Sequence, residues 1–208
     1  MGKTMNKKQM SLVLNMLMII FECIGFIVTM FVYNEISFEY YTEDSNILAL
    51  LVSIIFVLYL VADKKIPKWL ALLKYISTIC LTITFIVVIF ILIPMYNFDF
   101  IGMLIEGPFL YQHLLCPVLS VITFVVFDDL GQFTLKDNFY GMSLTALYGL
   151  VLIPLNVLDI IIGPYPFLMV KNQTLLISIL WSIMIFVLGY IIAYILRKLY
   201  DNYNYRGV

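Results

Sequence analysis

The chain has 208 residues, of which 63 % are apolar and 12 % are charged, with a net charge of −1 at pH 7. A soluble globular domain is nearer half apolar and a quarter charged, so this composition excludes a cytosolic enzyme, a disordered chain and a disulfide-stapled secreted module. A net charge close to zero also gives no reason to expect a nucleic-acid partner. The sequence therefore predicts an integral membrane protein that forms one domain.

Six stretches are long and apolar enough to cross a bilayer core, which takes about 20 helical residues at a rise of 1.5 Å per residue. They are residues 12–33, 42–62, 69–95, 109–127, 139–162 and 174–196. None of them shows the alternation with period two that is typical of a membrane β-barrel. We therefore predict an all-α protein whose single domain, residues 1–208, is a bundle of six transmembrane helices.

Lysine and arginine residues are distributed unevenly between the two sets of loops. With the N-terminus inside the cell, the outer loops carry only Lys171, whereas the cytoplasmic segments carry Lys3, Lys7, Lys8, Lys64, Lys65, Lys68, Lys136, Arg197, Lys198 and Arg206. The positive-inside rule then places both termini in the cytoplasm. The outer loops are acidic, which favours a neutral or zwitterionic lipid over an anionic soluble partner. Residue usage is typical of an AT-rich bacterium, so we predict the bacterial plasma membrane.

Ionisable groups inside a membrane span are costly, so each is a candidate functional residue. Glu22 lies near the middle of the first span, and Asp159 approaches the outer end of the fifth. His113, the only histidine, lies four residues into the fourth span. The wholly apolar part of the second span, residues 47–62, is only about 24 Å long as a helix. The polar turn before it, residues 42–46, is therefore drawn into the outer edge of the membrane.

A hydroxyl and an imidazole are expected at the same depth near the outer face. Thr42, Ser45 and Asn46 share one helix face, and His113 enters the membrane from the same side at about 6 Å depth. A hydroxyl beside a neutral imidazole is the minimum for nucleophilic acyl transfer. Two plainer interpretations stay open, in which Thr42 is a helix N-cap and His113 is an interhelical hydrogen-bonding group.

Other constellations are less specific. His113 and Cys116 are spaced i, i+3, but one histidine and scattered cysteines do not complete a tetrahedral zinc site, so we predict no metal and no cofactor. No acid is placed by the sequence to orient His113, and a complete catalytic triad is therefore not predicted. The remaining candidates for lining a pocket are Tyr41, Tyr111, Glu22, Asp159 and Tyr165.

Three short motifs resemble those of one membrane-protein family. YTEDSN at residues 41–46 resembles the aromatic-Thr-x-x-Ser-Asn signature of the bacterial Pr6Pr proteins, which are similar to the FAR-17a/AIG1-like (androgen-induced) membrane proteins. HLLCP at residues 113–117 resembles the His-x-x-x-Pro of their fourth helix. YPFL at residues 165–168 resembles their Tyr-Pro-Phe segment before the last helix. The order and spacing fit across nearly the whole chain.

The resemblance implies an intramembrane threonine hydrolase. Animal members cleave fatty acid esters of hydroxy fatty acids with a threonine and a histidine, so Thr42 would be the nucleophile and His113 the base. This chain ends the first motif with Ser-Asn as bacterial members do, whereas animal members differ there, so the substrate need not be the same. A lipid ester would enter between helices at the outer leaflet, and Asn46, followed by Ser45, is the candidate oxyanion donor.

Other functions are compatible with the same residues. An acceptor other than water would make the site an acyltransferase. A small six-helix subunit that captures a soluble molecule, or a lipid-binding protein without catalysis, would use the same outward pocket with Thr42 as a helix cap only. A hydrolase requires Thr42 and His113 within hydrogen-bonding reach, which distinguishes it from both.

Overall fold

The computed structural model describes residues 5–205, and every regular element in this part of the chain is helical. Lys3 and Arg206, which contribute to the predicted orientation, lie outside the described residues. The elements are α1 (Lys7–Tyr33), α2 (Tyr41–Val61), α3 (Lys68–Val87), η1 (Val88–Leu92), α4 (Ile93–Met95), α5 (Phe100–Leu104), η2 (Leu110–Leu115), α6 (Cys116–Ile122), η3 (Thr123–Phe127), α7 (Leu135–Gly141), α8 (Ser143–Val157), η4 (Pro166–Leu168), η5 (Val170–Asn172) and α9 (Leu175–Tyr205).

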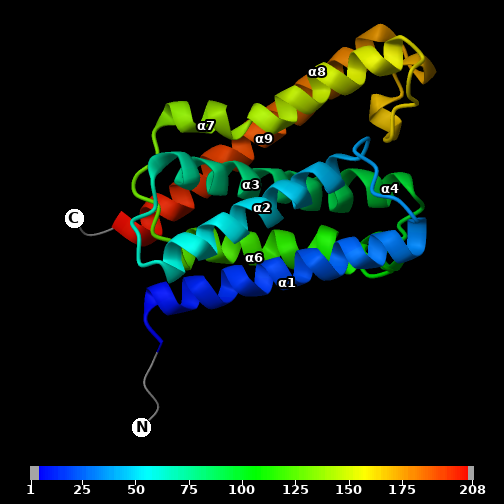
Figure 1. The fold of residues 1–208 in the computed structure, drawn as a ribbon. Helices are drawn as coiled ribbons and strands as arrows, with labels where there is room; N and C mark the ends of the chain where they lie inside the picture. Colours follow the sequence, from blue (N-terminus) through cyan, green and yellow to red (C-terminus); the bar gives the residue numbers. More distant parts are fainter. Residues whose placement is uncertain (1–4, 206–208) are drawn as a thin grey trace.

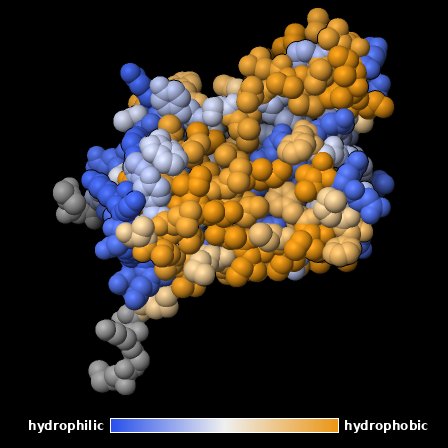
Figure 2. Space-filling model, viewed as in Figure 1, coloured by the Kyte–Doolittle hydropathy of each residue, from blue (hydrophilic) through white to orange (hydrophobic). Residues whose placement is uncertain are grey.

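The predicted all-α architecture with six membrane-spanning helices is confirmed for the described residues. Six helices are long and apolar enough to cross a membrane, namely Lys7–Tyr33, Tyr41–Val61, Lys68–Met95, Leu110–Phe127, Leu135–Val157 and Leu175–Tyr205. Figure 2 shows a broad apolar belt around the middle of the molecule, with hydrophilic residues gathered at its two ends. The chain is thus a multi-pass membrane protein.

Several helices begin or end at positions that hydropathy alone does not show. The first helix begins at Lys7 rather than at residue 12, because Asn6 and Gln9 form a capping box that satisfies its first backbone N–H groups. The fifth span begins at Leu135 rather than at residue 139, because Thr134 and Asp137 form another capping box. The last helix continues to Tyr205 rather than ending at residue 196.

The outer end of the fifth span is shorter than predicted. Helix α8 ends at Val157, five residues before the predicted boundary at residue 162. Asp159 has a positive φ of 58° and lies in the turn that follows. Its side chain is 74 % exposed and pairs with Lys171, so it is not an intramembrane acid. The prediction that Asp159 lies inside the fifth helix is therefore wrong.

Two of the spans contain π-helical stretches next to a proline. In the fourth span, Pro117 lacks an N–H, so it cannot bond the carbonyl of His113 in the usual α-helical pattern. The turn before it, η2, is π-helical over Leu110–Leu115. In the third span the π-helical η1 precedes Pro94 in the same way. Such π-helical turns are often found at functional sites, and here one of them carries His113.

Helix α3 lies at the centre of the bundle. It packs against α2, α6 and α9, and 67 % of the apolar stretch of its span is buried, against 11 % for the span formed by α9. The first residues of α1 and the last residues of α9 lie at the same end of the molecule, and α8 with the first half of α9 diverges from α2 and α3 toward the other end (Figure 1). The molecule thus has a sealed half, formed by α1, α2, α3 and η2–α6–η3, and an open half, formed by α8 and α9.

Candidate active site

Thr42 lies in the first turn of α2, but it does not cap the helix. The N-cap residue is Tyr40, which makes no side-chain capping bond, and α2 begins at Tyr41. Thr42 is 9 % exposed. The plainer interpretation of Thr42 as a helix cap is therefore wrong, and its hydroxyl is free to bond a group on another helix.

The partner of that hydroxyl is the single histidine. Thr42 Oγ1 lies 3.3 Å from His113 Nε2. On the other side of the ring, His113 Nδ1 lies 2.7 Å from the carbonyl oxygen of Met103 in α5. A carbonyl only accepts hydrogen bonds, so Nδ1 carries the proton and Nε2 presents a lone pair to the hydroxyl. The predicted juxtaposition of Thr42 and His113 is present, with the imidazole in the tautomer that a general base requires.

The imidazole is held in place by its surroundings as well as by its hydrogen bonds. The ring of Phe109 stacks on it at a centroid distance of 4.6 Å and an interplanar angle of 6°. His113 is only 5 % exposed. Stacking and the Met103 bond together fix the plane of the ring, and both of these partners of His113 come from one short segment, residues 103–109.

Ser45 and Asn46 are adjacent to Thr42, but they have a different role from the predicted one. Asn46 Nδ2 donates to the Thr42 carbonyl at 2.8 Å and to the Gln112 carbonyl at 3.4 Å. Ser45 Oγ donates to the Thr42 carbonyl at 3.0 Å. Both side chains thus direct their donors at backbone carbonyls instead of offering a free donor to a substrate oxyanion. Asn46 joins the start of α2 to η2, and Ser45 joins it to Thr84 of α3.

Tyr165 and Tyr41 lie on the other side of Thr42, as predicted for pocket residues. The backbone N–H of Thr42 donates to the Tyr165 hydroxyl at 3.4 Å. The Tyr41 hydroxyl lies 2.7 Å from Thr145 Oγ1. Burial raises the pKa of Tyr165 from an ordinary value of 10.0 to about 12, so its phenol is protonated at neutral pH.

An apolar pocket of about 480 Å³ opens beside these residues, between α3, α8 and α9. Thr42, Tyr41 and Tyr165 line it at one side, and Ala146, Gly149 and Trp181 are among the residues that line the rest. Its volume is in the range of small-molecule sites. The pocket lies between the sealed half and the open half. Thr42 lies at the boundary between the two halves, where it lines the pocket and also contacts His113.

Three of the predicted pocket residues are elsewhere. Tyr111 packs against Phe21 of α1, with ring centroids 6.0 Å apart, on the far side of η2 from the pocket. Glu22 is fully buried in the sealed half and does not line the pocket. Asp159 is exposed in the loop after α8. A polar or aromatic residue type within a span does not show which helix face points to the pocket.

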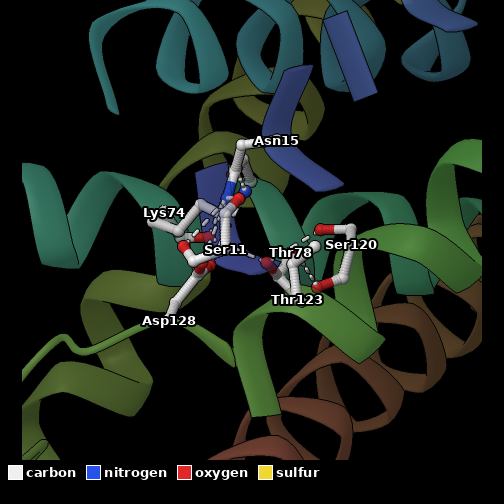
Figure 3. A network of polar contacts seen from close by, with 8 residues as sticks. Ser11, Asn15, Lys74, Thr78, Ser120, Thr123 and Asp128 are labelled. Atoms are coloured by element: carbon white, nitrogen blue, oxygen red, sulfur yellow. Dashed lines mark hydrogen bonds and ion pairs between the residues drawn. The ribbon is translucent and has the colours of Figure 1, made fainter. Parts of the chain in front are cut away.

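Sequence reasoning missed two groups of residues. Gln112, next to His113, is 1 % exposed and donates through Nε2 to the Glu43 carboxylate at 3.2 Å. A larger network joins α1, α3, α6 and the residues after η3, and its members are Ser11, Asn15, Lys74, Thr78, Ser120, Thr123 and Asp128 (Figure 3). The signal was present in the first span, where polar residues recur every four or seven positions along one face.

The described residues offer no metal centre. Within residues 5–205, no three His, Cys, Asp or Glu side chains are close enough together to hold a metal ion. The three cysteines are free thiols, with Cys80 and Cys116 buried and Cys23 exposed. The groups that the site itself presents are a hydroxyl, an imidazole and a phenol beside an apolar pocket.

Comparison of the chain with protein-family models, with curated proteins and with solved structures gave no match.

Proposed function

We propose that this protein is an intramembrane ester hydrolase that cleaves fatty-acyl esters with Thr42 as nucleophile and His113 as general base. The observation that carries the proposal is the 3.3 Å contact between Thr42 Oγ1 and His113 Nε2. It is supported by the apolar pocket of about 480 Å³ that begins at Thr42. The resemblance of residues 41–46, 113–117 and 165–168 to the Pr6Pr and androgen-induced membrane proteins points to the same chemistry.

The reaction proceeds in two acyl-transfer steps. Thr42 Oγ1 attacks the ester carbonyl carbon while His113 Nε2 takes its proton, and the alcohol leaves with that proton, which gives an acyl-threonine. Water then attacks the acyl-threonine, again with His113 as base, and releases the fatty acid and regenerates the Thr42 hydroxyl. The Met103 carbonyl holds the imidazole in one tautomer, and it stabilises the imidazolium that forms in each step.

The Tyr165 hydroxyl is our candidate for the oxyanion donor. Tyr165 lines the pocket beside Thr42, and its oxygen accepts the Thr42 backbone N–H. The phenol hydrogen is not used in any of the hydrogen bonds of the described residues, and the raised pKa keeps it in place. Ser45 and Asn46 have their donors directed at backbone carbonyls. A donor aimed at the oxyanion typically contributes about 10²–10³ in rate.

Charge distribution supports an orientation in which the site faces the outside of a plasma membrane. Lys7, Lys8, Lys64 and Lys65 lie at the end of the bundle opposite Thr42, and the positive-inside rule assigns that end to the cytoplasm. The pocket is then reached from the outer leaflet, and a membrane lipid ester is the substrate class. A bacterial plasma membrane fits the residue usage of the chain.

The proposal is tested by covalent labelling of the nucleophile. The purified protein in detergent is incubated with a long-chain fluorophosphonate, and the intact mass and the modified residue are measured by mass spectrometry. We expect one adduct, at Thr42, which is lost in Thr42→Ala and strongly reduced in His113→Ala. Ser182→Ala is the matched control, because it removes a hydroxyl from the same pocket far from His113, and it should label as the wild type does.

Two results would overturn this assignment. One is a folded wild-type protein, judged by its gel-filtration elution and melting curve, that takes up no adduct. The other is an adduct that persists in Thr42→Ala. In the first case the pocket would hold a lipid or a small molecule without reacting with it, as a binding subunit does.

A further inference from the structure

A row of polar side chains follows one face of α1 through the whole sealed half. Ser11, Asn15, Glu22 and Thr29, here called the polar stripe, are spaced four, seven and seven residues apart and share one helix face. All four are at most 2 % exposed. This face is buried against α2 and η2–α6–η3, and Lys74 of α3 also reaches it. Met18 and Gly25 lie between them on the same face. Polar groups at the depth of a bilayer core are costly, so four of them on one buried face are a functional candidate.

The lower part of the stripe meets a buried ion pair. Lys74 of α3 donates to Asn15 Oδ1 at 2.6 Å, and its ammonium lies 3.9 Å from Asp128 Oδ2. The other oxygen of Asp128 accepts from Ser11 at 2.6 Å and from Asn15 at 3.0 Å. Figure 3 shows these groups converging, with Thr78 and Ser120 alongside. Asp128 is thus held between the ammonium of Lys74 and the donors of Ser11 and Asn15.

The upper part of the stripe meets a second acid. Thr29 accepts from Gln112 Nε2 at 3.4 Å, and the same amide nitrogen donates to the carboxylate of Glu43 at 3.2 Å. Gly25 of α1 allows this close approach, because a Cβ there would lie 3.3 Å from Gln112 Cγ. The Glu43 carboxylate, 8 % exposed as a residue, is thus connected to α1 near the end of the bundle that carries Thr42.

Glu22 lies between these two ends and has no hydrogen-bond partner. It is fully buried, and neither of its carboxyl oxygens makes a hydrogen bond to the described residues. The Cys116 thiol on α6 faces its carboxyl as a weak donor, and Glu43 on α2 and Lys74 on α3 are the charged groups that act on it. A carboxyl with only a structural role would be expected to bond a neighbouring carbonyl or hydroxyl. Glu22 is about 16 Å along the helix from both Ser11 and Tyr33, so it lies at mid-depth.

The balance of buried charge determines whether the Glu22 carboxyl group carries a proton. Glu22, Glu43 and Asp128 are buried acids of this half, and Lys74 is the buried lysine among them. Asp128 has Lys74 at 3.9 Å. Lys74 therefore compensates only one of the three acids. A carboxylate without a cation in the middle of a bilayer would be strongly unfavourable, so Glu22 is a neutral carboxylic acid that carries a proton.

We propose that Glu22 is a proton-exchange site at the centre of the bundle, and that the polar stripe passes protons between the Lys74–Asp128 end and the Gln112–Glu43 end. When Glu22 releases its proton toward Glu43 it takes one up from the Asp128 side, or the reverse, and its carboxylic acid form is restored. The Lys74 ammonium stabilises the transient carboxylate. Along α1, Asn15 and Thr29 each lie seven residues, about 10 Å, from Glu22, which is too far for direct transfer, so the path requires water molecules between them.

The test is proton flux in vesicles. Purified protein is reconstituted into phosphatidylcholine vesicles that contain a pH-sensitive dye, and a potassium gradient with valinomycin imposes a membrane potential. We expect proton uptake faster than in protein-free vesicles, and we expect Glu22→Gln, which keeps the shape of the side chain, to return the rate to the protein-free value. Glu106→Gln is the matched control, because it neutralises an exposed acid in an outer loop, and it should conduct as the wild type does.

A second measurement needs no variant. Dicyclohexylcarbodiimide adds to protonated carboxyl groups in apolar surroundings, and we expect a mass adduct at Glu22 of the wild-type protein that stops the flux. Wild-type flux equal to that of protein-free vesicles, flux unchanged in Glu22→Gln, or modification at other acids with Glu22 unreacted would each overturn the proposal. Fluorophosphonate labelling of Glu22→Gln should still occur at Thr42, so the hydrolase and the proton path stand or fall separately.

Discussion

The sealed half of the molecule buries polar side chains, whereas the open half is mostly apolar. In the sealed half, α1, α2, α3 and α6 bury Asn15, Glu22, Lys74 and Asp128 out of contact with lipid. In the open half, α8 and α9 carry mostly apolar side chains and leave a pocket of about 480 Å³ beside α3. The difference shows how one very apolar sequence can hold both a polar interior and an apolar cavity. The proposed nucleophile lies where the two halves meet.

The arrangement of the helices explains this division. The span that contains α3 is mostly buried because helices cover it on several sides, whereas the span formed by α9 is mostly exposed. A helix that is covered by its neighbours can carry Lys74, because those neighbours supply its partners. A helix that faces lipid has no such neighbours, so a charged side chain on it would have no partners. Four substitutions test the distinction, from the largest expected effect to the smallest.

The substitution with the largest expected effect is at the boundary between the halves. Thr42→Ala removes the proposed nucleophile, and we expect hydrolysis of a long-chain 4-nitrophenyl ester to fall by at least about 10³-fold. Thr42→Ser keeps the hydroxyl and should retain much of the activity. The readout is the initial rate of nitrophenol release in detergent micelles. An alanine variant that hydrolyses the ester at the wild-type rate would remove Thr42 from the mechanism.

The next substitution breaks the sealed half. Lys74→Met leaves Asp128 buried without its cation, and breaking a buried ion pair typically costs about 3–5 kcal/mol. We expect a loss of that order in the free energy of unfolding, measured by titrating the detergent-solubilised protein with sodium dodecyl sulfate. Replacing both partners, as Lys74→Met with Asp128→Leu, should recover most of the loss. Equal stability of the wild type and Lys74→Met would show that the pair has no structural role.

The third substitution concerns the proposed oxyanion donor. Tyr165→Phe keeps the ring and removes the hydroxyl, and we expect kcat to fall by about 10²-fold with a small change in KM. Since burial raises the pKa of Tyr165 to about 12, its contribution to stability is present below pH 10 and is lost as the pH rises from about 10 to about 12. The phenol also stays protonated below pH 10, so the wild-type hydrolysis rate should show no loss from ionisation of Tyr165 in that range. A Phe variant with unchanged kcat would assign the role to another group.

The smallest effect is expected in the open half. A side chain at Gly149 would enter open space in the pocket, so Gly149→Trp should fill it. Because each buried methylene contributes about 0.8 kcal/mol, long-chain esters should lose more in kcat/KM than short-chain esters. Leu147→Trp is the control, since Leu147 is exposed outside the pocket. Equal losses for short and long esters would show that the chain binds elsewhere.

Sequence reasoning was sufficient for the number of spans and for the pairing of Thr42 with His113. Both depend on regular helix geometry, in which length and rise per residue give depth and side. It was not sufficient for Asp128, which follows an apolar stretch and is therefore expected in a loop. Its burial arises from Ser11 and Asn15, more than a hundred residues away in sequence. It was also misleading for Asp159, because the hydropathy of residues 158–162 continues after the backbone has turned at a left-handed residue.

The Met103 carbonyl is a third feature that could not be predicted from the sequence. It belongs to the peptide backbone of α5, and any residue at that position would provide the same oxygen. A search for acidic side chains near His113 therefore finds no orienting group, although the imidazole has one. The sequence does indicate the segment that supplies this carbonyl. Residues 103–113 form a short connection that returns the chain to the membrane directly before His113.

The same carbonyl makes part of this site invisible to mutagenesis. An alanine scan removes side chains and leaves every peptide oxygen in place, so the group that sets the tautomer of His113 would survive the scan at all positions. Insertions, deletions or prolines in α5 would move it, with the side chains of Thr42 and His113 untouched. Variants of this kind should lose activity with no change in either residue, whereas an alanine scan would attribute no catalytic importance to the segment that carries the carbonyl.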